Sequence, residues 1–370
     1  MQPTVINASG DDLTIGMAHA RSALDLRPAV LDWVRRATSS HPLSDPTVRE
    51  QLAEVKQAWR ELTPGTLDQV RGAAEVYGIA RDELLVALLA TYLTSRAGAE
   101  GRWAGARGAQ EEAEGCTALA VSRPRPLLAK NRDNDPRFLP MQTVLRVAPI
   151  RGHRWLALST AGAPGVHSSG MNEVGLCVAD THVPSSDVGP GVPRFSSMMH
   201  VLQECSTTAE AVEWLTSTPQ MGLGTITVLD ERGDTAVVEC GFRHTVTAPP
   251  AAGDDRPAAG AVATNHYIQP VLASCHLTPA DGTPEISTQA RRSTVDAALT
   301  AEGMDRAAVV DVLSSHLDFD GTDGRVGSVC QHGPALRSET ISTVVFDARD
   351  RYMDLCLGRP CSGEFTRIPV

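Results

Sequence analysis

The stretch Gly115–Ser122 reads GCTALAVS, and it divides the chain into two parts with different sequence patterns. Before it, apolar residues recur at helical spacing in several segments. The segment Gly101–Glu114, GRWAGARGAQEEAE, has no such periodicity and is expected to be an exposed loop. After it, short apolar or alternating runs predict strands. Cys116 therefore stands where a loop is expected to meet the first strand of a sheet.

The part before Gly101 is expected to be mostly helical. Met17–Ala37 has apolar residues at helical spacing, with Pro28 as a break. Thr47–Leu62 is amphipathic and follows a capping residue. The same pattern continues through Asp68–Tyr77 and Asp82–Leu93.

The part after Cys116 combines strands and helices. We expect strands at Thr117–Ser122, Leu127–Asn131, Gln142–Ala148, Trp155–Thr160, Val174–Asp180, Thr225–Asp230, Thr235–Cys240, Thr340–Asp347 and Tyr352–Leu357. We expect helices near Phe195–Cys205, Thr208–Thr216, Gln289–Ala301 and Asp305–Leu317, and a surface loop at Pro249–Gly260. This order of elements indicates a layered α+β fold in which helices cover the faces of sheets.

The charge and the amino terminus exclude several classes of protein. The 370 residues carry a net charge of -11, without a basic patch, which disfavours nucleic-acid binding and a polybasic membrane contact. The first residues have no basic start and no apolar run, so no secretory signal is expected. The longest apolar run, Leu84–Ala90, is too short to span a bilayer. We therefore expect a cytoplasmic protein.

Eight cysteines are scattered along the chain without a CxxC pair. No Cys/His group has the spacing of a zinc finger, so the sequence predicts no metal site. A disulfide scaffold is not expected in a cytoplasmic protein. We expect one of the eight cysteines to be a candidate for reactivity and the other seven to be small, buried, apolar residues of the core.

Cys116 is the candidate for that reactive thiol. Gly115 has no Cβ, so its carbonyl can be approached closely. If the thiol attacks this carbonyl and water releases the product, Cys116 becomes a new amino terminus. Its α-amino group, with an ordinary pKa near ~8, can then act as the base for its own thiol. The alternative from composition alone is a strand cysteine that fills space in the core.

Six short motifs, in order, resemble one family. They are Gly115-Cys116-Thr117, Asn131-Arg132-Asp133, the block formed by Ser159–Gly162 and Gly170–Leu176, Thr264–Tyr267, Ser328–Cys330, and Leu357–Pro360. Together they resemble isopenicillin N acyltransferase and its relatives. These are the acyl-coenzyme A:6-aminopenicillanic acid acyltransferase-like members of the N-terminal-nucleophile (Ntn) hydrolases. The agreement extends from Gly115 to about Phe365, and the residues before it resemble the family's smaller chain only weakly.

The resemblance implies roles for particular residues. Cys116 would be the nucleophile and Gly115–Cys116 the bond that the precursor cleaves in itself. Asp133 would hold the new amino group and orient the thiol. Asn265 would donate to the oxyanion of a tetrahedral intermediate. Arg132 replaces an aromatic residue of the family, and it either changes the acyl pocket or points to solvent.

The resemblance also implies roles for residues in the other motifs. Arg359 would bind the Asp133 carboxylate or assist the oxyanion. Thr160, Ala161 and Gly162 are candidates for an oxyanion or pocket wall through backbone N–H groups. A second family arginine corresponds to either Arg291 or Arg292. His266 is expected to be structural, and Cys330 and Ser328 are expected to pack rather than react.

The resemblance implies a four-layer αββα sandwich with an N-terminal helical segment. Residues 1–115 would form a helical propeptide or small chain and residues 116–370 the catalytic chain, the two staying associated after self-cleavage. The enzyme would form an acyl-thioester on Cys116 and pass the acyl group to water or to an amine. No cofactor is implied, although a coenzyme A thioester is a candidate acyl donor without a Lys/Arg cluster to mark its site. The acidic net charge favours hydrolysis, or an uncharged or cationic substrate. The alternative is an inactive Ntn-fold binding or scaffold protein.

Overall fold

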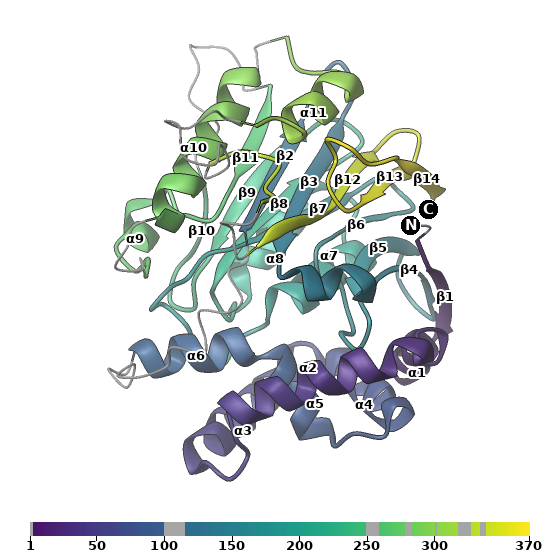
Figure 1. Ribbon diagram of the computed structural model, residues 1–370, viewed down its shortest axis with the longest axis vertical. Coiled ribbons are helices and arrows are strands. Elements are labelled where there is room, and N and C mark those ends of the chain that lie inside the picture. Colours follow the sequence, from purple (N-terminus) through teal and green to yellow (C-terminus); the bar gives the residue numbers. More distant parts are fainter. Residues whose placement is uncertain are drawn as a thin grey trace.

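The computed structural model describes residues 3–99, 115–248, 259–277, 283–299, 302–316, 327–333 and 338–370. The loop expected at Gly101–Glu114, and all but the end of the one expected at Pro249–Gly260, lie outside these residues. Two β-sheets lie in the centre of the described part, with helices on their outer faces (Figure 1).

The larger sheet has eight strands in the order β1-β4-β5-β6-β7-β8-β9-β10. Its strands are β1 (Val5–Gly10), β4 (Gln142–Pro149), β5 (Trp155–Thr160), β6 (Ser169–Asn172), β7 (Cys177–His182), β8 (Gly224–Leu229), β9 (Thr235–Cys240) and β10 (Thr245–Thr247). All neighbours are antiparallel except β1 and β4, which pair in parallel from Val5↔Val144 to Gly10↔Pro149. The strand β1 was not expected from the sequence, and it joins the N-terminal part to the main sheet.

The smaller sheet has six strands in the order β11-β2-β3-β12-β13-β14. They are β11 (Gly260–Ala263), β2 (Gly115–Val121), β3 (Leu127–Asn134), β12 (Glu339–Asp347), β13 (Tyr352–Leu357) and β14 (Thr366–Pro369). The antiparallel pair β2–β3 starts at Gly115↔Asp133 and places Cys116 opposite Arg132. This register brings the two motifs of the candidate site together.

Alternation along β2 assigns its two faces. Ala118 and Ala120 belong to the core between the two sheets, whereas Leu119 and Val121 pack toward the helices. On that outer face lie α10 (Thr283–Ala298) and α11 (Arg306–Leu313). The outer face of the larger sheet carries α7 (Arg194–Glu204) and α8 (Thr208–Ser217). Helices therefore cover both sheets, and the predicted αββα sandwich is confirmed.

The N-terminal part forms a helical layer at the bottom of the view in Figure 1. Its helices are α1 (Asp12–Ser22), η1 (Leu24–Leu26), α2 (Arg27–Ser40), α3 (Pro46–Leu62), α4 (Pro64–Tyr77), α5 (Arg81–Leu88) and α6 (Ala90–Ala99). The break predicted at Pro28 is confirmed, because this proline occupies the first turn of α2, where its missing N–H costs no helical hydrogen bond. Shorter helices, η3 (Pro136–Met141) and α9 (Pro270–Ala273), connect elements of the sandwich.

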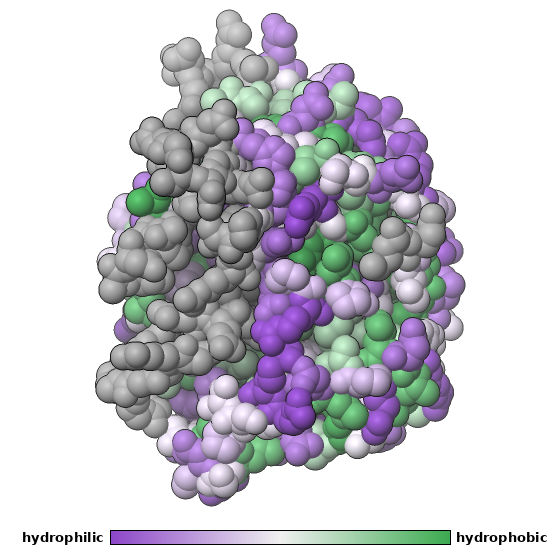
Figure 2. All heavy atoms as spheres, in the orientation of Figure 1, coloured by the Kyte–Doolittle hydropathy of each residue, from purple (hydrophilic) through white to green (hydrophobic). Residues whose placement is uncertain are grey.

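The surface in the view of Figure 2 mixes hydrophilic and hydrophobic residues, with a hydrophilic band running down its middle. None of the helices that the structure describes is both long enough and apolar enough to cross a membrane.

Candidate active site

Cys116 lies at the start of β2, with its side chain on the face shared with Ala118 and Ala120. The thiol therefore faces the space between the two sheets, and the residue is 5% exposed. Its backbone nitrogen donates a hydrogen bond of 2.9 Å to Oδ1 of Asn265. The peptide between Gly115 and Cys116 thus lies at the end of a strand, beside a side-chain acceptor.

Arg291 of α10 binds the same strand end from the opposite face. Its Nη1 donates to the Cys116 carbonyl oxygen at 2.5 Å and to Thr117 Oγ1 at 3.0 Å. Its Nη2 donates to Asn265 Oδ1 at 2.7 Å. Burial lowers the pKa of Arg291, and the nearby Asp133 carboxyl opposes that shift. Arg291 therefore fixes the positions of Cys116 and Asn265 together.

The ambiguity between two arginines is resolved by these contacts. Arg292, next in the chain, donates to the Val262 carbonyl and pairs with Asp296 on its own helix. Of these two arginines, Arg291 is the one that contacts Cys116.

Asp133 is fully buried in β3, opposite Gly115. Its Oδ1 accepts a hydrogen bond of 2.6 Å from Thr340 Oγ1, and its Oδ2 has no hydrogen-bond partner among the described residues. A Cβ added to Gly115 would lie 2.9 Å from that Oδ2, so the glycine permits the close approach. Burial raises the pKa of Asp133, against the opposing charge of Arg291. An under-bonded carboxyl group therefore lies beside the predicted cleavage bond.

Asn265 lies two residues after the end of β11, and its amide oxygen, amide nitrogen and backbone nitrogen all make hydrogen bonds. Oδ1 accepts from Cys116 and Arg291, while Nδ2 donates to the His182 carbonyl at 2.7 Å. The backbone nitrogen donates to Thr288 Oγ1 of α10. In the structure Asn265 accepts a hydrogen bond from the Cys116 nitrogen, whereas the family resemblance implied that its amide donates to an oxyanion.

His266 points toward α10. Its Nδ1 lies 3.0 Å from Thr288 Oγ1 and 3.2 Å from Thr264 Oγ1. Burial lowers its pKa to about 4. The ring is therefore neutral at pH 7 and bonded on the helix side of the sheet.

Arg359 lies apart from this cluster. Its side chain is exposed and its Nη2 donates to Glu339 Oε2 at 2.8 Å. The carboxyl of Asp133 is bonded instead to Thr340. The expected contact between Arg359 and Asp133 is thus not made, because the guanidinium pairs with Glu339 instead.

Thr160 ends β5 in the other sheet, and Ala161 and Gly162 follow it in a turn. Thr160 Oγ1 accepts a hydrogen bond from Arg132 Nη1, but the Ala161 nitrogen donates to the Met141 carbonyl. Gly162 has a φ of 82° and packs against Val30 of α2. Thr160 is therefore linked to the site by its hydrogen bond with Arg132. The Ala161 N–H is already bonded to Met141 and is not available to an oxyanion.

A cavity of about 120 Å³ opens next to Cys116. The two sheets contribute Lys130, Arg132 and Asp180 to its lining, and Arg194 of α7 completes the charged part. Apolar walls come from Phe195 and from the junction of α5 and α6, where Leu88, Leu89 and Tyr92 line it. The N-terminal part therefore closes one side of the cavity. Arg132, left undecided by the sequence, lines the cavity.

Three cations (Lys130, Arg132 and Arg194) and two carboxylates (Asp133 and Asp180) line this cavity. Asp180 Oδ1 lies 2.6 Å from Lys130 Nζ, and Asp180 Oδ2 lies 3.1 Å from Arg194 Nε. Burial alone would raise the pKa of Asp180, but Lys130 and Arg194 outweigh it and hold that pKa well below its usual range. Arg132 makes no ion pair with a carboxylate in the described part of the chain. The lining consequently carries excess positive charge.

Sequence reasoning missed Lys130, Asp180 and Arg194. One signal was present: Lys130 is one of only two lysines in the chain, and it lies within a predicted strand. A lone cation in an apolar strand indicates a buried partner. The partner itself, Asp180, comes from the other sheet and has no sequence signature.

Comparisons with known proteins show which proteins this chain is similar to. Among solved structures, two variants of conjugated bile acid hydrolase from Clostridium perfringens are similar to the chain, at 15% and 14% identity with TM-scores of 0.43 and 0.42. Each match covers 69% of this chain and 97% of the other. No curated protein matches the chain. The family model described as acyl-coenzyme A:6-aminopenicillanic acid acyl-transferase matches residues 121–362, more than half of the chain. The chain therefore belongs to the acyl-coenzyme A:6-aminopenicillanic acid acyl-transferase family.

Proposed function

We propose that the chain is a precursor that cleaves itself between Gly115 and Cys116 and then uses Cys116 as an N-terminal nucleophile. The family supplies the general chemistry, acyl transfer to or from an amide nitrogen. The observation that carries the finer proposal is the 2.9 Å hydrogen bond from the Cys116 nitrogen to Asn265 Oδ1. Such an acceptor would hold that nitrogen in place once it becomes a free amine.

Self-cleavage would begin with attack of the Cys116 sulfur on the Gly115 carbonyl carbon. The C–N peptide bond breaks as the C–S bond forms, and the leaving nitrogen takes up a proton. Water then hydrolyses the thioester to a Gly115 carboxylate and a free thiol. Asp133 supports this step because its Oδ2 lies beside Gly115 and its raised pKa suits proton transfer.

Turnover would reuse the same atoms. The α-amine of Cys116 takes the thiol proton as the sulfur attacks a substrate carbonyl, and the leaving group receives that proton. An acyl-thioester remains on Cys116 and passes to water or to an amine. Arg291 acts as a positioning residue, since it binds both the Cys116 carbonyl and Asn265 Oδ1. Nδ2 of Asn265 carries two N–H groups and donates one of them to the His182 carbonyl. In this proposal an N–H of the same amide donates to the oxyanion.

The cavity supports a substrate class. A cavity of about 150 Å³ accommodates a molecule the size of benzene, so about 120 Å³ suits a short acyl group. The excess positive charge from Arg132 favours an acyl group that carries an anionic substituent. This local charge is opposite to the net charge of -11, from which an uncharged or cationic substrate was expected. The acyl donor would be an amide or a thioester such as that of coenzyme A.

Intact-mass spectrometry of the freshly purified chain tests the proposal. Wild type should give two chains, of 115 and 370 − 115 = 255 residues, and Cys116→Ala should remain a single inactive chain. Cys275→Ala is the matched control, because it removes a partly exposed thiol outside the cluster and should process normally. An unbroken wild type whose Cys116 does not react with a thiol label would overturn the proposal and favour a non-catalytic binding protein. Processing of Cys116→Ala at the same bond would also overturn it.

A further inference from the structure

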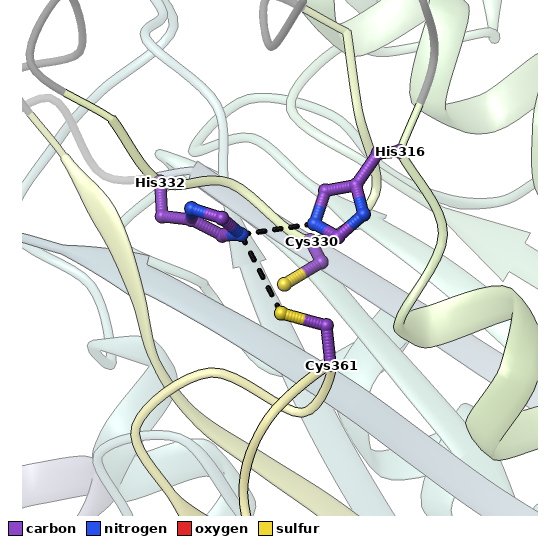
Figure 3. Close-up of side chains that lie close together, drawn as sticks. All are labelled: His316, Cys330, His332 and Cys361. Atoms are coloured by element: carbon purple, nitrogen blue, oxygen red, sulfur yellow. Dashed lines mark hydrogen bonds between the residues drawn. The ribbon is translucent and has the colours of Figure 1, made fainter.

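A second cluster of reactive side chains lies outside the candidate active site. His316 follows α11, Cys330 and His332 lie in the segment 327–333, and Cys361 follows β13 (Figure 3). One donor atom from each residue lies within 4.8 Å of the other three. His316 Nε2 is 2.9 Å from His332 Nε2, and Cys361 Sγ is 3.4 Å from His332 Nε2. Three separate segments thus direct two imidazoles and two thiols to one point, as Figure 3 shows.

The donor set and its dimensions match those of a tetrahedral metal site. Zinc binds cysteine sulfur at about 2.3 Å and histidine nitrogen at about 2.0–2.1 Å, which places tetrahedral donors about 3.3–3.8 Å apart. The separation of Cys361 Sγ and His332 Nε2 falls in this range, and the two imidazole nitrogens are slightly closer. Two thiols and two imidazoles select zinc over the oxygen-binding ions magnesium and calcium. Four protein ligands also close the site to water, as in structural zinc centres.

We propose that His316, Cys330, His332 and Cys361 bind one Zn²⁺ in a closed, structural site. Binding releases one proton from each thiol, so the bis-thiolate, bis-imidazole site is electrically neutral. No metal site was expected from the sequence, because the four residues have no zinc-finger spacing. Spacing rules find ligands carried on one or two local turns, whereas these ligands come from three segments that only the fold assembles.

The site lies next to the residue that holds Asp133. Gln331, between the ligands Cys330 and His332, donates from its backbone nitrogen to Thr340 Oγ1 at 2.9 Å. The Thr340 nitrogen donates back to the Gln331 carbonyl at 2.7 Å, and Thr340 Oγ1 donates to Asp133 Oδ1 at 2.6 Å. Zinc would therefore fix the segment that orients Thr340 and, through it, Asp133. This consequence for Asp133 rests on the proposed function; the zinc site itself does not.

The test is the zinc content of the full chain, purified under reducing conditions without a chelating resin. Elemental analysis after dialysis should find about one zinc per chain. Cobalt substituted for zinc should give the absorption bands of tetrahedral thiolate-bound Co²⁺. Cys361→Ser and His316→Asn remove exposed ligands and should lose most of the bound zinc while keeping the wild-type circular dichroism spectrum. Cys275→Ser is the matched control and should keep its zinc.

Three results would overturn the proposal. The first is a chain that binds no stoichiometric zinc even after reconstitution with zinc chloride. The second is equal zinc binding by the ligand variants, which would indicate adventitious metal. The third is a Cys330–Cys361 disulfide in the protein prepared under reducing conditions. Cys116→Ala separates this inference from the proposed function, because that variant should stay uncleaved yet bind as much zinc as wild type.

Discussion

Arg291 and Arg359 are the two arginines that compete for a role beside Cys116. Arg291 is buried and makes hydrogen bonds to Cys116, Thr117 and Asn265. Arg359 is exposed and pairs with Glu339. A buried guanidinium with several bonded partners is costly to remove, because the groups it leaves behind stay buried without a partner. An exposed ion pair contributes little.

The two arginines give a matched pair of variants. We expect Arg291→Gln to slow self-cleavage at least tenfold and to destabilise the chain by about 3–5 kcal/mol. Arg359→Gln should process at the wild-type rate with an unchanged melting temperature. Time-resolved intact-mass spectrometry and thermal unfolding measure both effects. Equal processing by the two variants would contradict the role given to Arg291.

Arg132 provides the prediction for substrate charge. Because its guanidinium lines the cavity without a carboxylate partner in the described chain, it is available to an anionic acyl group. Arg132→Gln should lower kcat/KM for an anionic acyl substrate roughly 10- to 150-fold, which corresponds to a loss of about 1.5–3 kcal/mol of transition-state stabilisation. The kcat/KM for the neutral isostere of that substrate should change much less. Arg132→Lys should retain part of the preference. A uniform loss for both substrates would show that the residue is structural.

At the scale of elements, the pair β2–β3 builds the site from two short sequence motifs. Alternation directs Cys116 and Arg132 to the space between the sheets and directs Asp133 toward α10. Cys116 and its carboxyl neighbour Asp133 thus lie on opposite faces of one sheet edge. Gly115, which lacks a side chain, lets Asp133 reach the peptide between them.

The N-terminal elements are integrated with the sandwich and not merely attached to it. The strand β1 pairs with β4, the Trp59 Nε1 of α3 donates to the Gly191 carbonyl, and His19 of α1 lies 3.2 Å from Thr143 of β4. The core cluster includes Trp33, Trp59 and residues of α7. Separation of the two parts would expose this apolar surface to water.

We therefore expect the two chains of the processed protein to elute together in size-exclusion chromatography and to separate only in denaturant. Deletion of residues 1–10, which removes β1, should lower the melting temperature of the uncleaved Cys116→Ala chain. The full-length Cys116→Ala chain, in which β1 is intact, is the control. Separation of the chains in native buffer would contradict this expectation.

At the scale of the whole molecule, buried neutral histidines make the fold sensitive to acid. Burial lowers the pKa of His19 to about 4, and burial together with the charge of Arg132 lowers that of His167 to about 3. Both rings have an ordinary pKa near ~6.5 when the chain unfolds. Below that pH the unfolded chain binds more protons than the folded chain, so stability falls as the pH falls.

The expected size follows from this linkage. Between pH 6.5 and pH 5 each histidine should cost about 2 kcal/mol of unfolding free energy. Urea unfolding of the uncleaved Cys116→Ala chain at pH 7 and pH 5 measures the loss. His19→Gln should reduce the difference in unfolding free energy between pH 7 and pH 5 by about 2 kcal/mol, the contribution of one histidine. An unchanged difference in that variant would contradict the assignment to His19.

By itself, the sequence determined the layered α+β class through its local patterns, and through the resemblance of its motifs to a family it implied the αββα order and the proximity of Cys116, Asp133 and Asn265. Alternating strands, capped helices and turn residues are local signals, and each depends on neighbours a few residues apart. The strand β1 escaped this reasoning because VINASG is too short and polar to indicate a strand, and its stability comes from pairing with β4.

Only the tertiary structure decided which distant side chains meet. It selected Arg291 over Arg359, aligned Lys130 and Asp180 across two sheets, and gathered His316, Cys330, His332 and Cys361 at one point. The physical reason is that hydrogen bonds, ion pairs and metal ligation depend on separations of a few ångströms in space. Sequence fixes such separations within a turn of helix or a strand pair, and beyond that range the packing of the two sheets and their helices sets them.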